Sequence, residues 1–240
     1  TSANREKTVE TVDLQRAFEE STGRSLSWFF DQWVFHGGHP EVKVATDWDS
    51  ENKSLKISFN QKQKQDELTP IFQFPIQFKI AHGSKESVFD FYVKTGEENF
   101  HIPCVEKPTF VSINPGNTIL ANWDFLPARD MLVAQLTTDS DCMGRISAAK
   151  ALAKDHSRQS VDALGSVLRT EKFWGVQAEI CDALAAIGSS IAVDHLIWAT
   201  KSLDHPRSRS RAVRALGGLR CTKAIEVFET CLKKDASPLV

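Results

Sequence analysis

Three stretches of ten residues decide the fold of the C-terminal half: MGRISAAKAL at 143–152, GVQAEICDAL at 175–184 and RSRSRAVRAL at 207–216. They are spaced by 32 residues, and each ends on the same Ala-Leu pair. The segments that follow them also match, with apolar residues at Leu164, Leu196 and Phe228. A fixed period that carries apolar residues in register is typical of stacked helical hairpins, because each hairpin is too thin to bury its apolar face alone. The sequence therefore predicts a short α-solenoid of about three hairpins.

The segment before the repeats, from Glu41 to about Leu126, alternates apolar and polar residues with a period of two. The alternating runs are EVKVATDW, SLKISFNQ, FQFPIQFKI, ESVFDFYVK, NFHIP, TFVSIN and TILANW. Turn-rich pieces such as DSENKS, AHGSK and NPGN separate them. Short strands at this spacing are typical of two packed antiparallel sheets, so we expect an Ig-like β-sandwich of about six or seven strands.

The first 40 residues contain two helical patterns, and the second of them is rich in aromatic residues. It reads SWFFDQWVFHGGHP at 27–40 and stops at the glycine pair and Pro40. Its bulky aromatics are Trp28, Phe29, Phe30, Trp33 and Phe35. These are too many for a solvated surface, so the helices must pack against something large. We expect that partner upstream of Thr1, with the sandwich or a neighbouring molecule as alternative surfaces.

The composition excludes several classes of function. The 29 Lys and Arg residues nearly balance the 31 Asp and Glu residues, so the chain has no strong overall attraction to nucleic acid or anionic lipid. No apolar run approaches the roughly 18 residues that are needed to cross a bilayer. The five cysteines form no Cys-x-x-Cys pair, which favours a reducing compartment. We therefore expect a cytoplasmic protein with neither a nucleic-acid nor a membrane partner.

The passage STGRSLSWFFDQWVFHGGHPEVKV at 21–44 resembles the end of the catalytic domain in the aminopeptidase N family of zinc metallopeptidases. In that family an apolar Phe-Phe-x-x-Trp helix is followed by Gly-x-Pro and the first strand of a β-sandwich. The matching residues here are Phe29, Phe30, Trp33, Gly38 and Pro40. The runs SLKISFNQKQ, FQFPIQF and KPTFVSINP are similar to the sandwich of this family. Some members also carry a terminal helical-repeat domain, so the resemblance spans nearly the whole chain.

This resemblance implies a multidomain protein of mixed α and β structure. Residues 1–40 would be the terminal helices of an upstream catalytic domain. Residues 41–127 would form the β-sandwich domain, and residues 128–240 a domain of HEAT-like helical repeats.

The catalytic motifs of the family are absent from these 240 residues. A His-Glu-x-x-His motif binds zinc because the two imidazoles share one helical face, yet none of the seven histidines is followed by Glu. The family's Gly-x-Met-Glu-Asn stretch is absent too. The catalytic tyrosine of the family has no counterpart, because the only tyrosine here, Tyr92, lies in a predicted strand. His36 and His39 flank a glycine pair that ends a helix, so we interpret them as turn residues. We therefore expect no catalytic, cofactor-binding or metal residue here, and the resemblance places the zinc of the parent upstream of Thr1.

A group of arginines is the candidate interaction surface. The stretch PRSRSRAVRALGGLR places Arg207, Arg211 and Arg214 on one face of a helix. Such a face could bind phosphates, acidic peptides or another subunit. The alternative is that these arginines pair with carboxylates of the adjoining repeat or are simply solvated, and we favour that interpretation because no aromatic residues interleave with them.

An aromatic pair precedes the second repeat. Phe173 and Trp174 stand where the third copy has His205 and Pro206. If exposed, they could anchor a partner, but packing within or between repeats is the more frequent role of such residues.

The function that follows is that of a non-catalytic C-terminal fragment, whose parent would be a zinc aminopeptidase acting on peptides. The fragment would frame and gate the substrate chamber, with the upstream catalytic domain of the same chain as its partner. Whether these residues contribute to an enzyme therefore depends on the parent. One alternative is a scaffold, similar to the subunit of transcription factor TFIID that resembles this family but has lost the zinc ligands. Another is a free-standing module whose repeat surface binds a protein.

Overall fold

The computed structural model describes residues 8–219 and 221–240, which form a β-sandwich followed by stacked helical hairpins. One sheet has the order β5-β2-β1-β7, and the other has the order β4-β3-β6. The strands are β1 (Glu41–Asp49), β2 (Ser54–Gln61), β3 (Phe74–His82), β4 (Lys85–Val93), β5 (Glu97–Pro103), β6 (Phe110–Ile113) and β7 (Asn122–Asp124). All neighbouring strands are antiparallel except β1 and β7, which are parallel.

The alternating pattern of the sequence sets which face of each strand is buried. In β2, the side chains of Leu55, Ile57 and Phe59 are buried, while Lys56 between them is exposed. A shift of the register by one residue would turn the apolar side chains outward, so burial fixes how the strands pair. Aromatic side chains dominate the core, where the ring of Phe59 meets those of Phe74, Phe100 and Trp123 at 6.2 Å between centroids.

The N-terminal helices are α1 (Thr11–Thr22), α2 (Ser27–Phe30) and a π-helical turn, η2 (Asp31–Phe35). Glu10 caps α1, because its N–H donates a hydrogen bond to the side chain of Asp13 and its backbone oxygen accepts one from the N–H of Asp13. The helix ends at Gly23, whose φ of 66° is the left-handed conformation that favours glycine. The aromatic helix does pack on the sandwich, but only in part. Phe30 is buried, and the Trp33 ring lies 4.9 Å from that of Phe72.

The repeats form two layers of helices. One layer holds the first helix of each hairpin, called a first-type helix: α4 (Cys142–Leu152), α6 (Trp174–Ile187) and α8 (Pro206–Gly218). The other layer holds the second helices, called second-type helices: α3 (Arg129–Thr138), α5 (Arg158–Thr170), α7 (Ser190–Ser202) and α9 (Ala224–Lys234). Helix α4 packs on α6, and α6 packs on α8. One continuous core joins the layers and includes the leucines of the three Ala-Leu pairs, Leu152, Leu184 and Leu216.

Helix α3 is a half repeat that the hairpin count from the sequence does not include. Its buried Leu132 lies 32 residues before Leu164, so α3 occupies the position of a second-type helix. No first-type helix precedes it within the described residues, and strand β6 packs against it instead. The sandwich therefore covers the first end of the solenoid.

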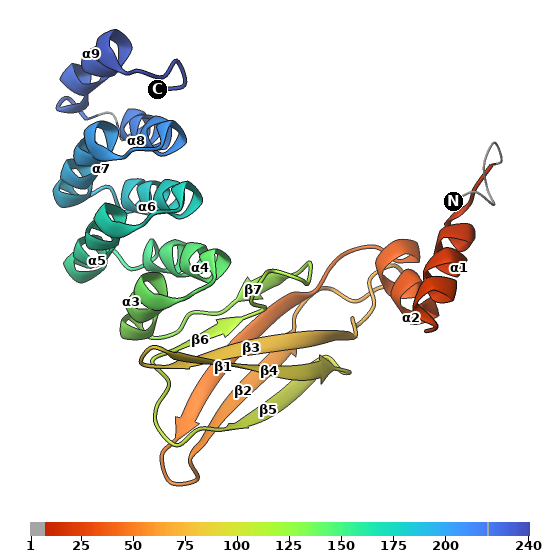
Figure 1. The fold of residues 1–240 in the computed structure, drawn as a ribbon. Helices are drawn as coiled ribbons and strands as arrows, with labels where there is room; N and C mark the ends of the chain where they lie inside the picture. The colour runs from red at the N-terminus through yellow and green to blue at the C-terminus, as the bar shows by residue number, and fades with distance from the viewer. Residues whose placement is uncertain (1–7, 220) are drawn as a thin grey trace.

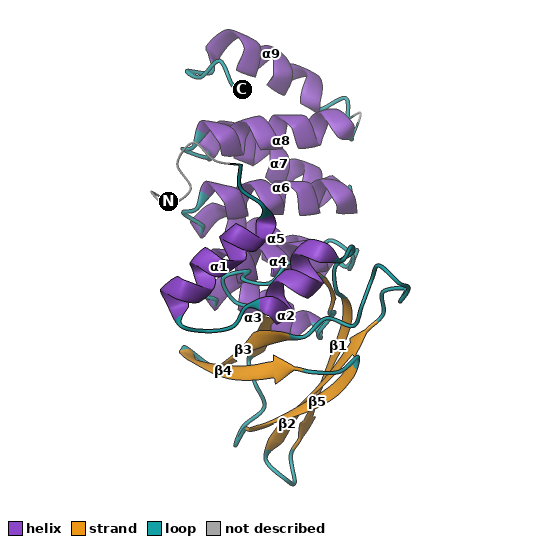
Figure 2. Ribbon diagram, turned by 90° about the vertical axis from the view of Figure 1, so that its right-hand side faces the viewer, coloured by secondary structure: helices purple, strands orange, loops and turns teal. Residues whose placement is uncertain are grey.

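The arrangement of the parts in space places both helical segments on one side of the sandwich (Figure 1). The solenoid rises from the end near β6, and α1 and α2 lie at the opposite end (Figure 1). The first-type helices lie on the side of the solenoid that is toward α1 and α2 (Figure 1), and in the view turned by 90° α1 and α2 are in front of its lower part (Figure 2).

No helix among residues 8–219 and 221–240 is both long and apolar enough to cross a membrane.

Gly165 of α5 allows a close approach between helices. A Cβ atom at this position would lie 2.2 Å from Nε2 of His195 on α7. We therefore expect Gly165→Ala to lower the free energy of unfolding by about 1–3 kcal/mol through overpacking. The control is Gly217→Ala in α8, where a Cβ would meet no atom within 4 Å, and which should be neutral or stabilising by about 0.5–1 kcal/mol. Urea unfolding measures both, and equal effects of the two variants would contradict this account.

Candidate functional site

The histidines, cysteines and carboxylates of the described residues are dispersed. Within the described ranges, no group of three or more His, Cys, Asp or Glu side chains could hold a metal ion. His36 and His39 lie in separate environments, because Nδ1 of His36 lies 2.7 Å from the backbone oxygen of Asp31, and Nε2 of His39 lies 2.9 Å from Nδ2 of Asn122. These contacts give the two imidazoles structural partners of their own.

The cysteines of the described chain are all free, and one of them lies deep in the repeats. Burial of Cys181 is the main cause that raises the pKa of its thiol to about 12. Because the thiolate is the nucleophilic form, this side chain is a packing residue at neutral pH.

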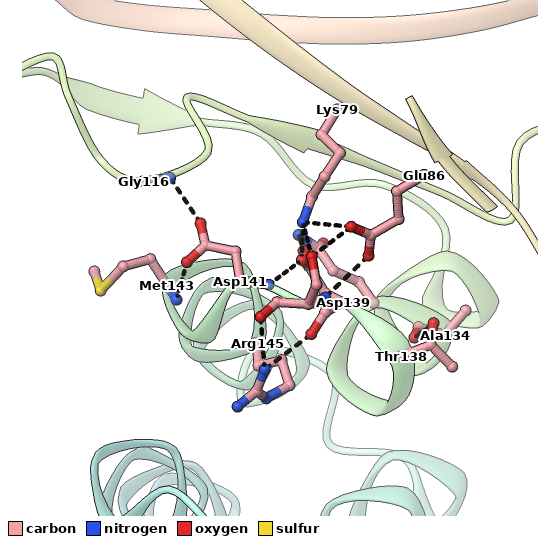
Figure 3. A network of polar contacts seen from close by, with 11 residues as sticks. Lys79, Glu86, Gly116, Ala134, Thr138, Asp139, Asp141, Met143 and Arg145 are labelled. Atoms are coloured by element: carbon pink, nitrogen blue, oxygen red, sulfur yellow. Dashed lines mark hydrogen bonds and ion pairs between the residues drawn. The ribbon is translucent and has the colours of Figure 1, made fainter. Parts of the chain in front are cut away.

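The most elaborate polar site lies where the sandwich meets the repeats (Figure 3). Lys79 of β3 and Asp139, which follows α3, form an ion pair in which both side chains are buried. Lys79 Nζ also lies 3.3 Å from Glu86 of β4 and donates a hydrogen bond to Ser140 at 3.2 Å. Two strands and one inter-helix turn therefore converge on a single ammonium group.

Further hydrogen bonds complete this junction on the side of the repeats. Asp139 accepts hydrogen bonds from the backbone N–H of Asp141 at 2.8 Å and from the amide of Gln135 at 3.2 Å. Asp141 caps α4 through the N–H of Met143 and accepts a second hydrogen bond from the N–H of Gly116 at 2.7 Å. The turn between α3 and α4 is therefore fixed to strands β3 and β4 of one sheet and to the segment that joins β6 to β7. Since a buried charge without a partner is costly, these contacts define one orientation of the solenoid on the sandwich.

Gly144 is a second requirement of the junction. A Cβ at this position would lie 2.0 Å from Oδ2 of Asp139. Any side chain at position 144 would therefore clash with the carboxylate of Asp139. The corresponding residues of the later copies are Val176 and Ser208, so the break in the repeat pattern at Gly144 was a signal available in the sequence.

The first-type helices share a polar position near their starts. In each copy the side chain at this position donates a hydrogen bond to the backbone carbonyl six residues before it: Arg145 to Asp139 at 2.9 Å, Gln177 to Glu171 at 2.8 Å and Arg209 to Leu203 at 3.0 Å. These carbonyls end the second-type helices and have no intrahelical donor. The repeated position therefore locks the turn between one copy and the next.

The three arginines of the predicted interaction surface have different environments. Arg211 Nε contacts both carboxylate oxygens of Asp182 on α6, at 2.7 and 2.8 Å. Arg207 is exposed and lies over the Trp174 ring, 4.9 Å from its centroid. Arg214 is exposed. Of the three, Arg207 and Arg214 have no carboxylate partner among the described residues. The predicted interaction surface is therefore reduced from three arginines to these two.

The aromatic pair at the start of α6 is divided between packing and solvent, with Phe173 as the N-cap and Trp174 as the first helical residue. The Trp174 ring stacks on His205 of the next copy, with an interplanar angle of 17° and a centroid distance of 5.6 Å. Phe173 is 40% exposed. The stacking joins two copies, and Phe173 is the residue that an external partner could reach.

Helices α1 and α2 present a large apolar surface that nothing in the described chain covers. No residue of α1 is buried. The exposed apolar side chains of α1, α2 and η2 are Val12, Leu14, Phe18, Trp28, Phe29, Val34 and Phe35, with exposed fractions between 41% and 60%. So many exposed apolar side chains on one short segment are typical of an interaction site. The buried Gln32, which exchanges two hydrogen bonds with the backbone of Gln73, anchors the opposite side of the segment to the sandwich.

Comparisons with known proteins agree with the two-part fold. Residues 129–205 match the family model described as HEAT repeats, and residues 208–234 match the model described as PBS lyase HEAT-like repeat. No curated protein matches the chain. Among solved structures, the chain is similar to Legionella pneumophila aminopeptidase A, crystallised in complex with aspartic acid, with 15% identity and a TM-score of 0.68. The alignment covers 96% of this chain and 34% of that protein, so the chain spans about a third of its length. At this identity the likeness concerns the fold.

Replacing Lys79 should destabilise the junction. Lys79→Met leaves the carboxylate of Asp139 buried without its counter-charge, and we expect the free energy of unfolding to fall by about 3–5 kcal/mol. The matched control is Lys56→Met on the exposed face of β2, which should change stability by less than about 0.5 kcal/mol. Urea unfolding of both variants is the measurement, and a Lys79→Met protein as stable as the control would rule out an energetic role for the pair.

The junction should also weaken in acid. Burial opposes ionisation of Glu86 and is the largest single influence on its pKa, but hydrogen bonds from Ser140 and Lys79 together outweigh it and hold the pKa below its usual value of 4.5. A lowered pKa contributes stability above the unfolded-state pKa, and this contribution is lost as the pH falls through the folded-state pKa. The stability difference between the wild type and Glu86→Gln should therefore be constant near pH 7 and shrink below about pH 4.5. A difference that stays constant down to pH 3 would contradict this.

Proposed function

We propose that this chain is the non-catalytic frame of a zinc aminopeptidase, and that it shapes and gates the substrate chamber of a catalytic domain in the same polypeptide. The observation that carries the proposal is the open apolar face of α1 and α2. One side of this segment is anchored to the sandwich through Gln32 and Trp33, and the other side exposes aromatic rings to solvent. A surface of this kind is expected to pack against a large apolar partner. The fold likeness to part of an aminopeptidase supports a catalytic domain as that partner.

The positions of the two helical segments agree with a framing role. The first-type layer of the solenoid faces α1 and α2 from the same side of the sandwich (Figure 1). A domain seated on α1 and α2 would therefore have the solenoid beside it. The described residues do not fit a zinc site, so in this proposal the metal and the chemistry belong to the catalytic domain. The contribution of this chain is position, and the buried Lys79–Asp139 pair is what holds the solenoid in place.

A scaffold role is the second candidate. The exposed Phe173 beside the stacked Trp174 and His205, together with the unpaired Arg207, favours it because aromatic and arginine side chains are frequent anchors of protein interfaces. A family member without zinc ligands would use the same frame for assembly.

The experiment that separates the two candidates is a zinc determination on the full-length parent protein, purified without added metal. An aminopeptidase should hold about one zinc per chain and release amino-terminal residues from peptides, with activity lost on chelation and restored by zinc. A parent that holds no zinc and takes none up on titration would be a scaffold, and the peptidase proposal would then be wrong.

Gating is tested in the same active protein. Loosening the junction with Lys79→Met should change kcat/KM for long peptides by at least about threefold relative to a dipeptide substrate, because only long substrates would pass the solenoid. Lys56→Met should leave this ratio unchanged. An unchanged ratio in Lys79→Met would show that the solenoid does not limit access, even if the zinc result supports the peptidase.

A further inference from the structure

Helix α9 exposes an apolar residue that its counterparts bury. Leu232 is 86% exposed. The residues at the same position of the other second-type helices, counted in steps of 32, are at most 2% exposed and are Leu136, Leu168 and Thr200. Leu136 and Leu168 belong to the continuous core of the repeats. Leu232 therefore lies at a core position of the repeat, but no further repeat packs against it within the described residues.

A second position and the adjoining helix show the same difference. Ile225 of α9 is 56% exposed, whereas the corresponding Val161 and Val193 are 1% and 7% exposed. In α8, Val213 is half-buried, although Ala149 and Cys181 at its position are fully buried. Since these side chains are all apolar, the difference lies in what covers them. The face formed by Val213, Ile225 and Leu232 has the character of an interface between repeats.

The turn after α9 combines a feature of the turn before α6 with features of the turn before α8. Asp235 accepts two hydrogen bonds from Arg209 at 2.8 Å, just as Glu171 accepts from Arg145 at 2.8 and 3.3 Å. Ser237 Oγ then accepts a hydrogen bond from the N–H of Leu239 at 3.3 Å.

The counterpart of Ser237 in the preceding copy is His205, which caps α8 by accepting from the N–H of Arg207. Pro238 lies 32 residues after Pro206, the first residue of α8. A capping side chain followed by proline is a helix start, because the fixed φ of proline suits the first helical position.

We propose that the face formed by Val213, Ile225 and Leu232 is the packing surface for a further first-type helix of the same polypeptide, which starts at Pro238 and lies against α8 as α8 lies against α6. The occupant is an amphipathic helix with small apolar residues in the pattern shared by α4, α6 and α8. This inference rests on the repeat register and the turn, so it stands or falls independently of any peptidase activity.

The first test extends the chain in register. Appending a copy of residues 209–218 after Val240 places the copies of Ala212, Ala215 and Leu216 at the repeat positions of the new helix. We expect the melting temperature to rise by on the order of 5 °C and amide exchange in α9 to slow by at least about tenfold, because Ile225 and Leu232 become covered. The matched control carries the same extension with those three apolar residues replaced by Asp. An extended chain that melts within about 1 °C of the control would overturn the proposal.

The second test examines the native occupant. In the full-length protein, Leu232→Asp should lower the melting temperature by on the order of 5 °C or more, while the same change in the 240-residue chain should shift it by less than about 2 °C. Lys233→Asp, at a neighbouring exposed position, is the control and should be neutral in both. A neutral Leu232→Asp in the full-length protein would refute a covering helix. Destabilisation that appears only at high concentration, with a dimer by light scattering, would assign the face to a second copy instead and would also overturn the proposal.

Discussion

The buried ion pair between Lys79 and Asp139 is the interaction on which the arrangement of the molecule depends. The sandwich and the solenoid each have a hydrophobic core, and Met131 of α3 packs against the core of the sandwich. A buried ammonium and a buried carboxylate are costly apart and satisfied together, so this pair favours the docking geometry in which the two groups meet. Lys79 also donates a hydrogen bond to Ser140 and lies 3.3 Å from the carboxylate of Glu86, and Gly144 leaves the space that the carboxylate of Asp139 fills.

A second constraint comes from the thinness of the helical hairpins. Every copy in the solenoid must be covered on both sides to bury its apolar residues. At the first end the sandwich provides this cover, because β6 packs on α3 in the place of a helix. At the other end Leu232 and Ile225 remain exposed. The two ends of the solenoid therefore differ in how they meet the same requirement, and this asymmetry is what identifies the open end as a surface for a further element.

Charge in the repeats serves mainly to connect one copy to the next. The stretch that contains Arg207, Arg211 and Arg214 has a strong basic character in the sequence. In the folded chain, Asp182 of the preceding copy pairs with Arg211, and Asp235 after α9 pairs with Arg209. Partly exposed pairs of this kind contribute modestly to stability, but they remove charge from the surface that a partner would meet. The remaining candidates for recognition are Arg207, Arg214 and the exposed Phe173.

The sequence by itself determined the two-part architecture, because both signals are local and periodic. Alternation with a period of two selected the strands, and the 32-residue repeat selected the helices and most of their buried positions, including Leu152, Leu184 and Leu216. Tertiary structure alone decided which residues far apart in the chain meet. The sequence gives no sign that Lys79 in a strand pairs with Asp139 after a helix 60 residues later, or that the sandwich covers α3. It also could not show which aromatic side chains of residues 27–35 are buried, since Phe30 and Trp33 face the sandwich while Phe29 and Phe35 do not. Such contacts depend on how whole elements pack, and periodicity carries no information on the relative placement of two separate cores.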